Sequence, residues 1–203
     1  MTLALEIAAL GAACIAASWA ATRVLIDVLA SHAILDRPNA RSSHRAPVPR
    51  GGGIAVIGVA LPAWALVSAL SSERPATMAV VLAGALGLAL LSWGDDRKGM
   101  PIVLRLGAQA VTIGVVFTMA PGRWDLFGGL LPPWAAMAAV GLAWLWFINL
   151  FNFMDGIDAI SGTEAVSVGA GLALVLLVAP GTGGDALPLA GFGLTLAAAA
   201  ASR

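Results

Sequence analysis

Long apolar runs constrain the fold of this chain more than any other feature of its sequence. A membrane-spanning helix needs about 20 mainly apolar residues. Six apolar runs of the sequence are of about this length, and a seventh, shorter run begins near Leu187 and continues almost to Arg203. The sequence therefore predicts an all-α fold, a polytopic transmembrane helical bundle with about seven spans, forming a single transmembrane domain over residues 1–203. The six longer runs lie at residues 3–29, 52–70, 76–93, 102–120, 132–151 and 163–179.

The composition excludes several classes of protein. Hydrophobic residues make up 60% of the 203 residues and charged residues 11%, whereas roughly a quarter of a soluble domain is charged. A soluble globule of this size could not bury so much apolar surface. The formal net charge is zero, so no overall basic field attracts a polyanion. We therefore exclude a soluble enzyme, a disordered chain and a nucleic-acid-binding protein.

The seventh run is shorter than a full span. It offers about 14 residues before Ser202, and a crossing needs about 20. We therefore expect the chain to be truncated at its C-terminus, inside a helix. A short, tilted or re-entrant segment is the alternative.

Basic residues are concentrated in alternate connecting segments. The segments near residues 30–51, 94–102 and 152–162, with their flanks, carry most of the arginines and the single lysine, whereas the other segments carry only Arg74 and Arg123. The positive-inside rule places the basic set in the cytoplasm and the N-terminus on the opposite side of the membrane. A soluble substrate and a lipid headgroup can meet at these cytoplasmic segments.

The first cytoplasmic segment is rich in arginine, proline and glycine. Residues 36–53 contain four arginines, and arginines bind phosphates through charge-assisted hydrogen bonds. His44 lies among them, and Arg50 precedes three glycines, where a backbone can approach a ligand closely. The alternative is a basic loop that only sets topology and contacts anionic lipid.

Two adjacent carboxylates, Asp95 and Asp96, mark the second cytoplasmic segment. Such carboxylates repel each other and are tolerated when a divalent cation or a metal-bound phosphate lies between them. Lys98, the only lysine of the chain, follows closely, and two residues separate it from Asp95. The alternative is a solvated helix end, in which Arg97 and Lys98 neutralise the two acids.

Polar residues recur at every third position in the third cytoplasmic segment. Asn149, Asn152, Asp155 and Asp158 follow this spacing, which places them on one helix face or in a turn. Amide and carboxylate oxygens are hard ligands suited to magnesium, and they can also hydrogen-bond a nucleobase. A polar turn with no other role explains these four residues less well than a functional site does.

Other polar residues are assigned structural roles. Ser161 with Glu164 fits a capping box, so the next helix is expected to begin there. Arg23 and Asp27, four residues apart, predict a local ion pair. Cys14, the single cysteine, is expected to pack against lipid or another helix.

Taken in order, the three segments resemble the polyprenyl-phosphate N-acetylhexosamine-1-phosphate transferases of glycosyltransferase family 4. Residues 36–53 are similar to the family's D-x-P-N-x-R-x-x-H-x-x-P-x-P-R-x-G-G loop. Residues 94–96 match its G-D-D motif, which is followed by Arg105 and Gln109. Residues 149–158 match its N-x-x-N-x-x-D-G-x-D motif. The first loop is more similar to the O-antigen and teichoic-acid branch than to the peptidoglycan branch.

The resemblance implies a phosphoryl transfer at the cytoplasmic face of the bacterial inner membrane. Undecaprenyl phosphate would attack the sugar-proximal phosphorus of a UDP-N-acetylhexosamine and release UMP, which is the first step of lipid-linked cell-envelope glycan assembly. The expected cofactor is Mg²⁺. The expected partners are the UDP-sugar, undecaprenyl phosphate and membrane lipid, without nucleic acid.

The same resemblance implies a role for each motif residue. Asp95 would take the residual proton or steer the lipid phosphate, and Asp96 would support the metal and the diphosphate. Asn152 would lie at the magnesium. Substrate binding would fall to Asp155, Asp158, Asn149, His44, Arg50 and Lys98.

Two other functions compete with this interpretation. The CDP-alcohol phosphatidyltransferases use D-x-x-D-G-x-x-A-R, but Asn152 replaces the first Asp and Ile160 replaces the Arg, so this class is excluded. An inactive fragment or a polytopic carrier of lipid headgroups is the other alternative. Ionisable residues in mid-span would favour a transporter, whereas Asp95, Asp96, Asp155 and Asp158 are expected at the cytoplasmic ends of the spans. The family's later F-M-G-D-x-G-S motif does not occur within the 203 residues, so we expect little turnover from them alone.

Overall fold

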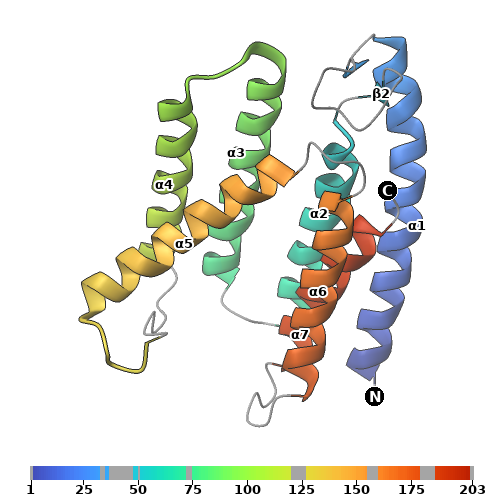
Figure 1. Cartoon of the computed structure of the whole chain (residues 1–203). Coiled ribbons are helices and arrows are strands. Elements are labelled where there is room, and N and C mark those ends of the chain that lie inside the picture. Colours follow the sequence, from blue (N-terminus) through green and yellow to red (C-terminus); the bar gives the residue numbers. More distant parts are fainter. Residues whose placement is uncertain are drawn as a thin grey trace. The chain divides into compact units, whose positions relative to one another are not determined.

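Helices account for nearly all of the part of the chain that the structure describes. This computed structural model describes residues 2–32, 35–36, 48–49, 51–71, 75–119, 127–154, 160–178 and 186–201. Each helix coincides with one of the predicted apolar runs, so the all-α fold is confirmed (Figure 1). The helices are α1 (Thr2–Ser31), α2 (Gly53–Ser71), α3 (Pro75–Lys98), α4 (Ile102–Met119), α5 (Pro133–Met154), α6 (Ile160–Val178) and α7 (Ala186–Ala200).

Most of these helices can cross a membrane. Within the described ranges, five are long and apolar enough to do so, namely α1, α3, α4, α5 and α6. Helices α2 and α7 are shorter apolar helices, over Gly53–Ala69 and Ala190–Ala200. The sequence predicts six full spans, and five of them reach the full length. The protein is therefore a multi-pass helical membrane protein.

Two short strands lie between α1 and α2 in the chain. Strand β1 (Leu35–Asp36) pairs with strand β2 (Val48–Pro49) in antiparallel fashion, with Leu35 opposite Pro49 and Asp36 opposite Val48. His44 and Arg50 lie outside the described residues.

The chain divides into two compact units that interleave along the sequence. Unit 1 comprises Met1–Glu73 and Met154–Arg203, and so contains α1, α2, α6 and α7. Unit 2 comprises Arg74–Phe153 and contains α3, α4 and α5. Unit 1 is therefore built from two stretches of chain that unit 2 separates.

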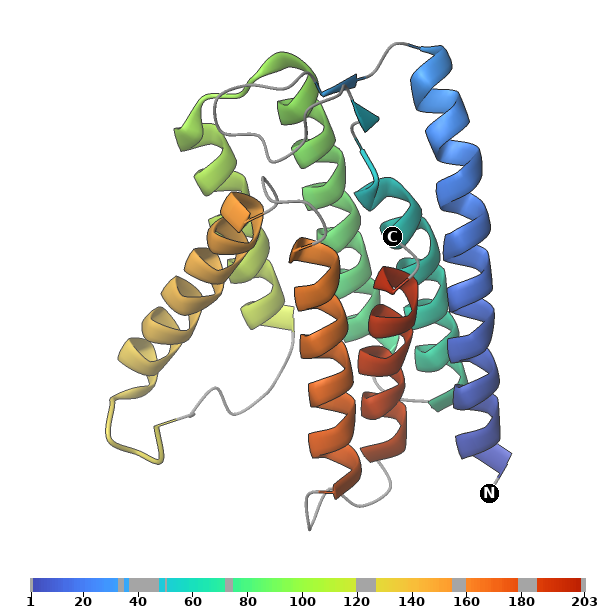
Figure 2. The same cartoon turned by 45° about the vertical axis from the view of Figure 1, so that its right-hand side comes forward.

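Helix α7 is the centre of unit 1. It contacts α1, α2 and α6, and Figure 2 shows it among these three helices. Most of its residues from Ala190 onward are buried, and Thr195 and Ala199 are both 0% exposed. Its small side chains allow three neighbouring helices to approach closely, which is how membrane helices pack without a hydrophobic driving force between them.

Helices α6 and α7 cross at a pair of glycines. A methyl group added to Gly169 would lie 2.6 Å from the carbonyl oxygen of Gly193, and one added to Gly193 would lie 2.5 Å from the carbonyl oxygen of Gly169. Ala173 and Ala197, four residues further along each helix, continue the contact. This small-x-x-x-small arrangement brings two helix backbones together without intervening side chains.

Polar groups on α1 and α2 also bind the backbone of α7. The Ser18 hydroxyl donates a hydrogen bond to the carbonyl oxygen of Ala199 at 2.6 Å, and the Trp64 indole N–H donates to that of Phe192 at 3.1 Å. The Trp64 ring also packs edge-on against Phe192. Cys14 is buried in a cluster with Ala63 and Ala198, which confirms that it packs against other helices.

The Ser18 hydrogen bond gives a direct test of this packing. We expect Ser18→Ala to lower the free energy of unfolding in detergent by about 0.5–1.5 kcal/mol, because it leaves a buried interhelical bond unmade. Ser31→Ala is the matched control, since the exposed Ser31 hydroxyl binds Val28 of its own helix. Thermal unfolding followed by circular dichroism would measure both variants. Equal stability of the two would contradict the packing of α1 on α7.

Two structural assignments from the sequence are wrong. Ser161 lies inside the first turn of α6 and is buried, and among the described residues its hydroxyl has no hydrogen-bond partner. The capping box with Glu164 is therefore not formed. The ion pair of Arg23 with Asp27 is also absent from the described part of the chain. The Arg23 guanidinium instead lies 4.8 Å from the centre of the Trp19 ring in a cation–π contact, one helical turn in the other direction.

Candidate functional site

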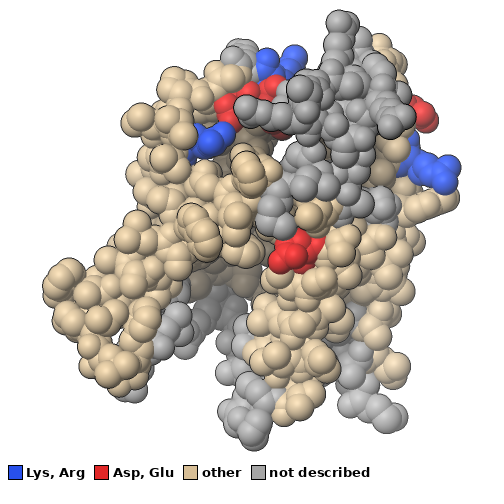
Figure 3. All heavy atoms as spheres, in the orientation of Figure 1, with Lys and Arg blue, Asp and Glu red and all other residues tan. Residues whose placement is uncertain are grey.

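The charged residues that the structure describes in unit 2 gather at one end of it, which we call the polar end. Asp95, Asp96, Arg97 and Lys98 lie in the last turn of α3, and Arg105 lies in the first turn of α4. Figure 3 shows acidic and basic side chains together where α3 ends and α4 begins. The rest of the described residues in α3, α4 and α5 are uncharged. Within the residues that the structure describes in unit 2, charged side chains are therefore confined to this end.

A tight turn creates the polar end. Helix α3 ends at Lys98, and Gly99 follows with a left-handed φ of 66°, a conformation that favours glycine at a helix C-terminus. The Gly99 N–H donates to the Asp95 carbonyl oxygen at 2.8 Å. The Met100 N–H then donates to the Asp95 carboxylate at 2.5 Å. Asp95 and Asp96 thus lie within the last turn of α3, whereas the sequence predicts that they belong to a loop near residues 94–102.

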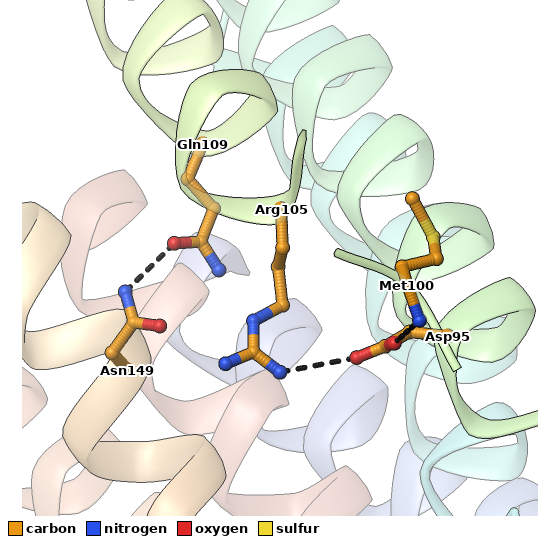
Figure 4. Close-up of polar contacts among 5 residues, drawn as sticks. All are labelled: Asp95, Met100, Arg105, Gln109 and Asn149. Atoms are coloured by element: carbon orange, nitrogen blue, oxygen red, sulfur yellow. Dashed lines mark hydrogen bonds and ion pairs between the residues drawn. The ribbon is translucent and has the colours of Figure 1, made fainter. Parts of the chain in front are cut away.

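Asp95 also joins α3 to α4. Its second carboxylate oxygen pairs with Nη1 of Arg105 at 3.1 Å (Figure 4), and the two side chains are 20% and 27% exposed. Both oxygens of Asp95 are thus engaged, one by a backbone N–H and one by a guanidinium. This arrangement fixes the direction of the carboxylate and neutralises its charge. Asp96, the next residue, has an exposed side chain.

A second polar contact joins α4 to α5. Gln109 lies one helical turn after Arg105 and is buried, in line with Ile113 and Val116. Its side-chain oxygen accepts a hydrogen bond from Nδ2 of Asn149 at 2.7 Å (Figure 4). The same Asn149 nitrogen donates to the carbonyl oxygen of Leu145 at 2.8 Å. A buried amide is tolerated here because its partner is polar.

Apolar packing continues this interface away from the polar end. The rings of Phe117 and Trp144 lie 6.1 Å apart. Gly141 leaves room for Phe117, because a methyl group there would lie 3.3 Å from the ring. Helix α5 thereby holds its polar last turns against the polar first turns of α4.

The structure places some of the predicted site residues and not others. Asp95 and Asp96 lie at the end of α3, and Asn149 and Asn152 lie in the last turns of α5 rather than in the predicted inter-helix turn. Asn149 is brought to α4, and Asn152 is exposed. Lys98 ends α3, and its side chain lies outside the description. The residues outside the described ranges are His44, Arg50, Asp155 and Asp158.

Two residues of the polar end received no role from the sequence. Arg105 and Gln109 are matched to the family motif there, but no chemistry is attached to either. The structure shows that they contact Asp95 and Asn149 respectively. The signal in the sequence is their spacing, because two polar residues four apart in an apolar helix share one face.

The donor atoms of this region suit magnesium. Asp96 and Asn152 both have exposed side chains that carry hard oxygen donors. Among the residues searched, no three His, Cys, Asp or Glu side chains lie together as a metal cluster. Magnesium does not need such a cluster, because it binds one or two carboxylates together with substrate phosphates and water.

The fold and the site define a class, a helical membrane protein with charged and amide side chains gathered where its spans end. Residues 78–202 match the family model described as glycosyl transferase family 4. The chain therefore belongs to this family, and the family resemblance predicted from the three motifs is confirmed. The matched region runs from α3 through α7 and includes the polar end.

Curated relatives support the same grouping. The undecaprenyl-phosphate alpha-N-acetylglucosaminyl 1-phosphate transferase of Yersinia pestis is 29% identical over 145 residues, which cover 68% of this chain and 38% of the relative. The protein of the same name from Salmonella typhi is 28% identical over 149 residues, or 70% of this chain and 40% of the relative. The chain thus spans about two fifths of the length of these relatives.

Proposed function

We propose that this protein transfers an N-acetylhexosamine 1-phosphate from a UDP-sugar to undecaprenyl phosphate and releases UMP. The observation that carries the proposal is the polar region of unit 2, where Asp95 pairs with Arg105 and Gln109 accepts a hydrogen bond from Asn149, in a protein that belongs to glycosyl transferase family 4. The names of the relatives describe a transfer of this kind to undecaprenyl phosphate.

The proposed reaction depends on positioning more than on a strong base. A phosphate monoester has a second pKa of about 6, so the lipid phosphate is largely dianionic at pH 7. One of its oxygens forms a bond to the sugar-proximal phosphorus. The bond from that phosphorus to the bridging oxygen of UMP breaks, and UMP leaves with the electron pair. Two anionic groups must therefore be brought together in line, with their charge neutralised.

The residues of the polar end supply these functions in the proposal. Arg105, oriented by Asp95, presents a fixed positive charge to a phosphate. Asp95 steers the lipid phosphate through this pair. Asp96 and Asn152 would hold Mg²⁺, which when bound neutralises charge on the diphosphate.

The remaining motif residues keep the substrate-binding roles that the sequence assigns to them. Asp155 and Asp158 are proposed to contact the nucleotide or the sugar phosphate. His44, Arg50 and Lys98 are proposed phosphate contacts, because cationic side chains bind phosphate oxygens by charge-assisted hydrogen bonds. Asn149 is the amide through which the site contacts the donor.

The arrangement of unit 1 supports a cytoplasmic site in the bacterial inner membrane. The end of α1 and the starts of α2 and α6 lie at the same end of this unit in both ribbon views (Figure 1, Figure 2). The sequence that connects α1 to α2 at this end contains four arginines, and the positive-inside rule assigns such a basic segment to the cytoplasm. The proposal therefore places the N-terminus on the periplasmic side.

A transfer assay tests the proposal directly. Washed membranes that contain the protein expressed from its intact gene are incubated with radioactive UDP-N-acetylglucosamine, undecaprenyl phosphate and Mg²⁺. We expect a labelled lipid product, release of UMP, and loss of both after EDTA treatment. Membranes without the protein are the control. A carrier of lipid headgroups would bind undecaprenyl phosphate without forming UMP. Absence of both the lipid product and UMP exchange would overturn the proposal.

A further inference from the structure

Gln109 is a buried amide between two membrane-spanning helices. Its side chain is 6% exposed and lies on the face of α4 that also buries Ile113 and Val116. An aliphatic side chain would continue that apolar face, and a buried polar group is costly unless it is hydrogen-bonded. Interhelical hydrogen bonds contribute only modestly to the stability of membrane bundles. The burial of Gln109 therefore indicates a role other than packing between the two helices.

The hydrogen bonds of Asn149 determine which way its amide points. Nδ2 donates both to the Leu145 carbonyl oxygen at 2.8 Å and to the Gln109 side-chain oxygen at 2.7 Å. A backbone carbonyl can only accept, so the nitrogen of Asn149 must face it. Both hydrogens of this nitrogen are then used, and Oδ1 is directed away from both partners.

The same contact determines the direction of the Gln109 amide. Its oxygen accepts from Asn149, so its nitrogen points elsewhere as a donor. In Figure 4, Oδ1 of Asn149 and Nε2 of Gln109 both point to the side on which the Arg105 guanidinium lies. An acceptor, an amide donor and a guanidinium held by Asp95 thus face one region.

We propose that Gln109 is a positioning residue, which holds Asn149 with its side-chain oxygen turned toward the Arg105 side to accept a hydrogen bond from the sugar nucleotide. This inference rests on the proposed function. The ligand chemistry matches the Asn149 acceptor and the Arg105 guanidinium, because a sugar nucleotide combines hydroxyl and N–H donors with anionic phosphate oxygens. Without the Gln109 oxygen, the Leu145 carbonyl oxygen is the one remaining acceptor for the Asn149 nitrogen. The amide is then held by one hydrogen bond in place of two, so it presents its oxygen to the donor for a smaller fraction of the time.

Gln109→Met tests the proposal in the full-length enzyme, because methionine has a similar length and no acceptor oxygen. We expect the KM for UDP-N-acetylglucosamine to rise about tenfold, with kcat changed less than about threefold. The reason is that the lost contact binds the substrate equally in the ground state and in the transition state. Asn149→Ala should raise the KM similarly. The double variant should be no worse than Asn149→Ala, because Gln109 acts only through Asn149.

Two further variants separate positioning from packing. Gln109→Glu keeps an oxygen that accepts from Asn149, so the KM should fall back toward that of the wild type. Thr112→Val is the matched control one turn along α4. The Thr112 hydroxyl binds Ala108 of its own helix, and valine keeps the methyl group that lies against Gly84. Its KM should equal that of the wild type.

The outcomes separate this inference from the proposed function. If the wild-type enzyme forms the lipid product but Gln109→Met leaves the KM unchanged, or if the Gln109→Met and Asn149→Ala effects are additive, the positioning role is overturned alone. Equilibrium binding of UDP-N-acetylglucosamine to the purified proteins gives a second readout and should weaken in parallel with the KM. If the wild type neither transfers the sugar phosphate nor binds this nucleotide, both proposals fail.

Discussion

In the proposed reaction, Asp95→Asn and Asp96→Asn are each expected to lower the rate of sugar-phosphate transfer by about 100-fold or more. Asp95 orients Arg105, Asp96 is the proposed magnesium ligand, and each substitution removes a negative charge that the proposal requires at the site. Their effects on stability should differ. Asp95 accepts a hydrogen bond from the Met100 N–H and pairs with Arg105, so Asp95→Asn removes the negative partner of the ion pair that joins α3 to α4. We expect it to lower the free energy of unfolding by about 1–2 kcal/mol.

Asp96→Asn should leave stability within about 0.5 kcal/mol of the wild type, because the Asp96 side chain is exposed and surface substitutions have small effects. Asp27→Asn on α1 is the control for loss of an exposed acid and should change neither quantity. Radioactive transfer in membranes and thermal unfolding in detergent measure the two quantities. Wild-type rates for both Asp95→Asn and Asp96→Asn would exclude the polar end as the site of transfer.

Gly193→Ala is expected to destabilise unit 1 strongly. The new methyl would lie 2.5 Å from the carbonyl oxygen of Gly169 and 3.2 Å from the amide nitrogen of Ala173. Both are backbone atoms, so relief requires α6 and α7 to move apart. We expect a loss of about 2–3 kcal/mol or more, as overpacking of a tight interface costs this much.

Gly171→Ala is the matched control for this substitution. Gly171 lies in α6, the helix that Gly193 of α7 contacts, but a methyl group at Gly171 would have nothing within 4 Å. Alanine is the better helix former by about 1 kcal/mol, so this variant should be as stable as the wild type or more so. Thermal unfolding and the yield of monodisperse protein in detergent would measure both. If Gly193→Ala matches Gly171→Ala, the close crossing of α6 and α7 is wrong.

The number and approximate limits of the helices could be predicted because length and apolarity govern membrane insertion. The observed helix ends differ from the predicted ones where the residues of the following turn determine how far the helix continues. Gly99 can adopt a left-handed φ, so α3 continues through Asp95 and Asp96 before it ends. Hydrophobicity alone ended the predicted span earlier. Similarly, α5 continues to Met154 and takes Asn149 and Asn152 into the helix.

The partners of the site residues could not be predicted from the sequence. The motif spacing identified Asp95 and Asn149, but contacts between helices depend on how α3, α4 and α5 face one another. The pairing of Asp95 with Arg105 and of Asn149 with Gln109 comes from that packing. The burial of α7 was missed for the same reason, because an alanine- and glycine-rich helix is equally compatible with lipid and with a protein interior.

The interleaving of the two units has a consequence for biosynthesis. Helices α1 and α2 belong to a unit whose central helix, α7, follows only after Arg74–Phe153 and α6 have been translated. At 5–20 residues per second, unit 2 alone takes roughly 4–16 s to synthesise. Throughout that time the Ser18 hydroxyl and the Trp64 indole lack the carbonyl groups of α7 that they bind in the finished protein. In the nascent chain, α1 and α2 therefore remain without their contacts to α7 during this time. In that state they are available for binding by a membrane chaperone or by the insertion machinery.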